Sequence, residues 1–61
     1  PPLLTPREAE VAHLAVHHSS REIAERLAIS VRTVDNHLAA VYAKLGIRGR
    51  GELAEVLTPP R

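Results

Sequence analysis

The chain has 61 residues and no cysteine, which limits it to one small domain without disulfides or thiolate metal sites. Hydrophobic residues make up 44% and charged residues 25% of the chain, a composition typical of a folded domain rather than a disordered tail. The net charge of +1 excludes a uniformly basic surface, and the single aromatic residue, Tyr42, argues against a stacking platform for single-stranded nucleic acid.

The first predicted helix begins after Thr5. Residues 5–8 read Thr-Pro-Arg-Glu, which is a capping box: the Thr5 hydroxyl accepts a hydrogen bond from the Glu8 amide, and the Glu8 carboxylate accepts one from the Thr5 amide. Apolar residues at positions 11, 14 and 15 follow at helical spacing, and the pattern ends near His17. We therefore expect a helix that ends just before the histidine pair.

A second capping box opens a short second helix. Residues 19–22 read Ser-Ser-Arg-Glu, and the apolar residues that follow, up to Leu27, share one helical face. Only residues 28–30 separate Leu27 from the next helical pattern, and Ser30 is a suitable N-cap for it. So short a connection predicts a sharp angle between the second and third helices.

The third helix is predicted from about Val31 to Leu45, with Gly46 as its left-handed C-terminal stop. At about 100° per residue, one face of it is apolar and the other mostly polar. The apolar face holds Val34, Leu38, Val41 and Leu45, and the opposite face holds Arg32, Asp35, Asn36 and Ala39. A last helix is predicted from about Gly49 to Leu57, followed by Thr58-Pro59-Pro60. The predicted fold is an all-α four-helix bundle.

The second and third helices match a helix-turn-helix, in which the second of the two helices enters the major groove of double-stranded DNA. The outer face of residues 31–45 suits this role. Arg32 can donate two hydrogen bonds to guanine, Asn36 can pair with adenine, and Asp35 can accept from the cytosine amino group. Ala39 leaves room for a close approach, although alanine is also simply a good helix former. We predict DNA base contacts from these four residues.

Positive charge is concentrated in residues 30–51, which carry +3, whereas the rest of the chain carries −2. DNA phosphates are bound by cations, hydroxyls and free amides at helix N-termini. The predicted contacts to the DNA backbone are Ser19, Ser20, Arg21, Thr33, Lys44, Arg48 and Arg50. For Ser19 a purely capping role is an equal alternative, and Arg48 and Arg50 could equally be solvated loop charges.

Other functions have weaker support in the sequence. His13 and His17 have the four-residue spacing of a zinc pair, but solvated histidines are the simpler interpretation, and we expect no metal and no cofactor. The chain has no nucleophile motif, paired carboxylates or cofactor loop, so we expect no enzyme. The main alternative is a protein-interaction or dimerisation module with weak DNA affinity. Its contact surface would be the apolar side of the last helix, namely Leu53, Ala54, Val56 and Leu57.

Four stretches together carry a family resemblance. They are Leu4-Thr5-Pro6-Arg7-Glu8, Arg21 to Leu27 (Arg-Glu-Ile-Ala-Glu-Arg-Leu), Ile29-Ser30 with Arg32-Thr33-Val34, and Lys44-Leu45-Gly46-Ile47 with Arg50. Over residues 3–57 the chain resembles the C-terminal helix-turn-helix DNA-binding domain of LuxR-type transcriptional regulators. The stretch from Thr33 to Leu38 looks like the variant common among actinobacterial members. Residues 1–2 and 58–61 then remain as linker or terminal segments.

The resemblance implies roles for individual residues. Arg32 and Asn36 occupy positions that contact bases in some members, whereas the residue after Thr33-Val34, often a lysine in the family, is Asp35 here. Thr33, Lys44 and Arg50 match positions of backbone contact or local support.

The resemblance also bears on helix ends and partners. Gly49 stands where the family commonly has a serine cap, so the last helix is expected to be weakly capped. Ala28 stands where the turn often holds glycine, and we expect its backbone to stay outside the left-handed region. The family implies a homodimer formed through the last helix, contact with the transcription machinery and a sensing domain ahead of this one. With no bilayer-spanning apolar run and no signal-peptide pattern, we expect a cytoplasmic, nucleoid-associated protein.

Overall fold

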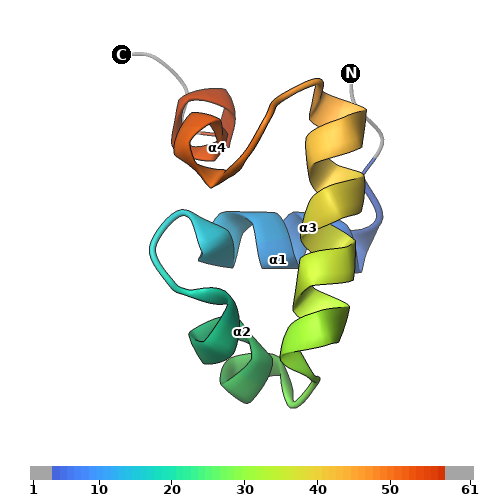
Figure 1. Cartoon of the computed structure of the whole chain (residues 1–61), viewed down its shortest axis with the longest axis vertical. Helices are drawn as coiled ribbons and strands as arrows, with labels where there is room; N and C mark the ends of the chain where they lie inside the picture. Colours follow the sequence, from blue (N-terminus) through green and yellow to red (C-terminus); the bar gives the residue numbers. More distant parts are fainter. Residues whose placement is uncertain (1–3, 58–61) are drawn as a thin grey trace.

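The computed structural model describes residues 4–57, and this part of the chain contains helices but no strand. The helices are α1 (Pro6–Ala15), α2 (Ser20–Leu27), α3 (Val31–Leu45) and α4 (Arg50–Leu57) (Figure 1). The predicted all-α fold with a helix-turn-helix in α2 and α3 is thus confirmed. Segments 1–2 and 58–61, predicted as linker or terminal segments, lie outside the described residues. Between residues 4 and 57, no helix has the length and apolar character needed to cross a membrane.

The four helices pack around one small core. α3 packs against α1 and α2, while α4 packs against α1, which lies between α2 and α4 in the view of Figure 1. The largest fully buried side chains are Val11 from α1, Ile23 from α2, Val34 and Val41 from α3, and Leu53 from α4. Burying a side chain of this size contributes about 1.5–3 kcal/mol. Each helix is therefore fixed to the core by at least one large apolar side chain.

Both predicted capping boxes are present. In α1 the Glu8 amide donates to Thr5 Oγ1 at 3.1 Å, and the Thr5 amide donates to Glu8 Oε1 at 2.9 Å. In α2 the Glu22 amide donates to Ser19 Oγ at 3.2 Å, and the Ser19 amide donates to Glu22 Oε1 at 2.9 Å. These bonds satisfy amides that the first turn of a helix would otherwise leave without a partner, which explains why the two helices start where the sequence predicts.

The last two helices also begin and end close to their predicted positions. α3 ends at Gly46 in the left-handed region, with φ of 69°, as predicted. α4 begins at Arg50, one residue later than predicted. Its weak glycine start is supplemented by Glu52, whose carboxylate accepts from the Arg48 amide at 2.7 Å. This bond ties the residue before Gly49 to the first turn of α4, but it does not replace the side-chain acceptor that glycine lacks.

The prediction for Ala28 is wrong. Its backbone lies in the left-handed region, with φ of 57° and ψ of 42°. This conformation lets the Ile29 amide turn back to the Ala24 carbonyl at 3.0 Å and closes the last turn of α2. It also lets Ile29 pack against the core. The turn between α2 and α3 therefore requires a left-handed backbone at position 28, whichever residue occupies it. Alanine is strained in this conformation, whereas glycine is not.

Candidate nucleic-acid interface

The outer face of α3 is exposed along much of its length. The four residues predicted to contact bases, Arg32, Asp35, Asn36 and Ala39, are all exposed. They share a face because residues three and four apart lie together on a helix, and the opposite face is anchored in the core. Val31 is 42% exposed at the start of the same helix and adds an apolar side chain to this end. The sequence did not indicate that Val31 would be exposed. It is apolar and lies three residues before Val34, the first buried residue of α3, so helical spacing is equally compatible with burial.

The N-terminus of α3 is held by hydroxyl groups. Ser30 Oγ accepts from the Thr33 amide at 3.0 Å and also lies 2.9 Å from Thr33 Oγ1, where either hydroxyl can donate. Thr33 is half-buried, so its side chain supports the first turn of α3 rather than extending outward. The partial positive charge of a helix N-terminus nevertheless favours an anion near this turn.

The cations predicted to bind phosphates fall into two groups. Arg21, Arg32 and Arg48 are exposed, and within residues 4–57 their guanidinium groups form no hydrogen bond or ion pair. Lys44 and Arg50 instead bond to other side chains of the fold. Arg21, Arg32 and Arg48 therefore keep all their guanidinium N–H donors available at the surface.

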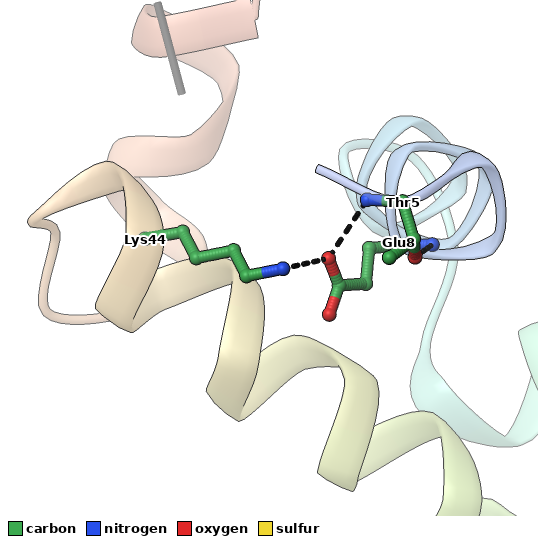
Figure 2. A network of polar contacts seen from close by, with 3 residues as sticks. All are labelled: Thr5, Glu8 and Lys44. Carbon is green, nitrogen blue, oxygen red and sulfur yellow. Dashed lines mark hydrogen bonds and ion pairs between the residues drawn. The ribbon is translucent and has the colours of Figure 1, made fainter. Parts of the chain in front are cut away.

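Lys44 joins the C-terminal part of α3 to the start of α1 (Figure 2). Its Nζ donates to Glu8 Oε1 at 2.6 Å, the same oxygen that accepts from the Thr5 amide. The Glu8 side chain is only 11% exposed, whereas that of Lys44 is 38% exposed. The bond from Lys44, together with that from the Thr5 amide, holds the pKa of the Glu8 carboxyl below its usual value. Lys44 therefore neutralises a nearly buried carboxylate that also caps a helix.

A second network connects three helices. Arg50 Nη2, at the start of α4, donates to Ser20 Oγ at 3.0 Å, and Ser20 Oγ donates to Asp35 Oδ1 on α3 at 2.9 Å. Arg50 is half-buried, and its Nε atom is buried without a hydrogen-bond partner within residues 4–57. The structure thus brings together three predicted DNA contacts that lie 15 and 30 residues apart in sequence. No local spacing pattern could have revealed this.

The apolar residues predicted as a dimer surface on α4 differ in exposure. Leu53 is fully buried in the core of this chain. Ala54 and Leu57 are half-buried, and Val56 is 47% exposed. The part of this set that remains open to a partner is therefore centred on Val56.

The histidines considered for zinc lie on the surface of α1. His13 and His17 are both exposed, and Glu10 beside them is paired with Arg7 at 3.4 Å. No group of three or more histidine, cysteine, aspartate or glutamate side chains in residues 4–57 is arranged to hold a metal ion. An open, shallow depression on α2 is lined by Glu22, Glu25 and Arg26. The candidate interface is therefore the outer face of α3, with the exposed Arg32, Asp35 and Asn36.

Comparison with known proteins agrees with this geometry. Residues 2–57 match the family model described as bacterial regulatory proteins, luxR family. The spore germination protein GerE of Bacillus subtilis is 48% identical over 52 residues, which are 84% of this chain and 70% of GerE. The oxygen regulatory protein NreC of Staphylococcus aureus is 41% identical over 54 residues, which are 87% of this chain but 25% of NreC.

A third relative, Mb0914c of Mycobacterium bovis, is 47% identical over 53 residues, which are 6% of that protein. The chain thus spans most of GerE but only a minor part of the other two relatives. No solved structure gives a significant match. The family model covers all four helices and both capping boxes, so the chain belongs to the luxR family of bacterial regulatory proteins, whose helix-turn-helix domain binds DNA in transcriptional regulation.

Proposed function

We propose that this domain binds double-stranded DNA sequence-specifically, with α3 in the major groove, as part of a bacterial transcriptional regulator. The observation that carries the proposal is the division of α3 into a face buried in the core and an outer face that stays exposed. The major groove is about 12 Å wide and admits a single α-helix. The small side chain of Ala39 lets the helix axis approach the groove floor.

Base contacts are assigned to the exposed face of α3. The Arg32 side chain has no partner within residues 4–57, and its guanidinium can donate two hydrogen bonds to guanine. Asn36 can pair with adenine, and Asp35 can accept from a base amino group. Val31 adds an apolar surface suited to a thymine methyl group.

Contacts to the DNA backbone are assigned to residues that keep a free donor. Within the described range, 4–57, the guanidinium groups of Arg21 and Arg48 have no partner, and the Ser19 hydroxyl accepts a capping bond but retains its own proton. Thr33 contributes at the α3 N-terminus. By contrast, Ser20, Lys44 and Arg50 bond within the fold, so their principal role is to support the interface.

The proposed partner on DNA is a second copy of the chain, which would contact Val56, Ala54 and Leu57 of α4. Leu53 is buried in the core and holds α4 against the rest of the domain. We expect the domain to lie in the cytoplasm, at the nucleoid when it is bound to DNA. The whole regulator would also contact the transcription machinery, and we propose no catalytic activity. The exposed Val56 and the low net charge also support the alternative of a protein-interaction module with weak DNA affinity.

The test is a salt series of DNA binding, measured by fluorescence anisotropy with a short labelled duplex. Removal of one phosphate contact should reduce the slope of log K against log salt by about 0.9. Arg21→Ala and Arg48→Ala should each do so. Arg7→Ala removes the same charge from α1, where Arg7 pairs with Glu10, and serves as the matched control that leaves the slope unchanged.

Amide NMR with the same duplex separates the two candidate functions. Shifts in residues 19–21 and 31–36 that weaken as salt increases would support DNA binding through α3. Absence of any binding at low salt would refute the proposal and favour a protein partner of α4.

A further inference from the structure

We propose that Asp35 selects cytosine at one position of the DNA site, and that Ser20 and Arg50 are positioning residues that hold its carboxylate for this contact. The inference rests on the proposed function. Its basis is the network in which Arg50 Nη2 lies 3.0 Å from Ser20 Oγ, and Ser20 Oγ lies 2.9 Å from Asp35 Oδ1. The three side chains come from α4, α2 and α3, so three helices determine where the carboxylate points.

The direction of each hydrogen bond in this network is fixed by chemistry. A guanidinium can only donate, and an ionised carboxylate can only accept. Ser20 must therefore accept from Arg50 and give its single hydroxyl proton to Asp35. The Ser20 proton is then unavailable to a phosphate, and the orientation of the Asp35 carboxylate is restricted through its Oδ1.

The second oxygen of Asp35 is left for a ligand. Asp35 is exposed, and within residues 4–57 the only hydrogen bond of its carboxylate is the one from Ser20 to Oδ1. Oδ2 thus keeps its full accepting capacity on the outer face of α3. This is the same face that carries the exposed Arg32 and Asn36.

The network also offsets the charge that makes an acidic residue unfavourable next to DNA. The Arg50 guanidinium lies two hydrogen bonds from Asp35, its Nη2 donates to Ser20, and its Nε is buried. The combined charge of the pair is zero. Phosphates approaching α3 therefore meet a compensated carboxylate instead of an isolated one.

Base chemistry then gives the preference. In the major groove cytosine presents an amino donor, guanine presents two acceptors, and thymine presents an acceptor and a methyl group. Adenine also has an amino donor, but its N7 acceptor lies beside it and would repel a carboxylate. An acceptor held at a fixed place on α3 should consequently favour cytosine over the other three bases.

The experiment is selection of bound duplexes from a randomised library, followed by binding measurements on the selected site with each base at every position. The unmodified chain should prefer cytosine at one position by about tenfold. Asp35→Asn should shift the preference at that position toward adenine, because the amide both donates and accepts. Preferences at positions read by Arg32 and Asn36 should not change.

The positioning role is tested with Ser20. Ser20→Ala should reduce the cytosine preference severalfold at the same position only, while Ser20→Thr, which keeps the hydroxyl, should restore it. Folding of the variants is checked by their amide NMR spectra, and Ser19, the actual cap of α2, is left intact.

The outcomes distinguish the inference from the function on which it rests. Failure of the unmodified chain to bind any duplex would refute the proposed function. Sequence-specific binding without a cytosine preference that depends on Asp35 would overturn the inference and leave the function standing. An unchanged preference in Ser20→Ala would refute the positioning role.

Discussion

Replacing Ala28 by glycine should stabilise the domain, because Ala28 is the one non-glycine residue in the described part of the chain with a positive φ. An L-residue in the left-handed region is strained by about 1–2 kcal/mol relative to glycine. Glycine increases the entropy of the unfolded chain, which offsets about 0.4–1 kcal/mol of that gain. Ala28 is exposed, so its methyl group contributes little packing. The net increase in the free energy of unfolding should be about 0.5–1 kcal/mol.

The assay is thermal unfolding followed by circular dichroism. For a domain of this size, 1 kcal/mol corresponds to a change of about 4–8 °C in Tm, so Ala28→Gly should raise Tm by roughly 2–8 °C. Gly46→Ala is the reverse experiment: its added Cβ meets nothing within 4 Å, so strain at φ of 69° alone should lower Tm by a similar amount. Ala39→Gly, on the exposed face of α3, controls for glycine itself and should destabilise by about 1 kcal/mol. An unchanged or lower Tm in Ala28→Gly would refute the argument from strain.

Three further predictions concern charge and assembly. The pKa of Glu8 is lowered in the folded state, so its contribution to the free energy of unfolding should be complete above pH 4.5, the ordinary pKa, and should be lost as the pH falls below that value. Glu8→Gln should weaken this loss of stability in acid, as measured by unfolding at a series of pH values. An unchanged acid dependence would contradict the role given to Glu8. Lys44→Met should lower Tm but leave the salt slope of DNA binding unaltered, since its ammonium group binds Glu8; a slope reduced by about 0.9 would instead identify a phosphate contact. Val56→Glu should preserve the monomer fold yet yield complexes with one protein copy in native mass spectrometry, whereas two copies would place the dimer contact elsewhere.

Features that depend on neighbouring residues could be predicted from the sequence. The capping boxes of α1 and α2 join residues three apart, and Gly46 marks the end of α3, so these helix boundaries follow from local chemistry. The two faces of α3 follow from helical periodicity in the same way.

Features that depend on the packing of helices could not be predicted. Lys44 and Glu8 are 36 residues apart, and Ser20 meets Asp35 and Arg50 only after α2, α3 and α4 have packed. Residue type and charge alone therefore could not show that Ser20, Lys44 and Arg50 also bond to other side chains of the fold. Ala28 differs in kind: its residue type argued against a left-handed backbone, but the geometry of the turn required one.

The network of Arg50, Ser20 and Asp35 has a consequence for attempts to retarget this domain to new sequences. Arg32, Asn36 and Ala39 form no side-chain bond within residues 4–57, so a library can vary them without disturbing the scaffold. Replacing Asp35 alone by a residue with no side-chain acceptor would leave the Ser20 proton without its partner and remove the negative charge that ends the Arg50–Ser20–Asp35 network. A protein engineer should therefore randomise the first three positions independently, and should vary Asp35 only together with its two partners.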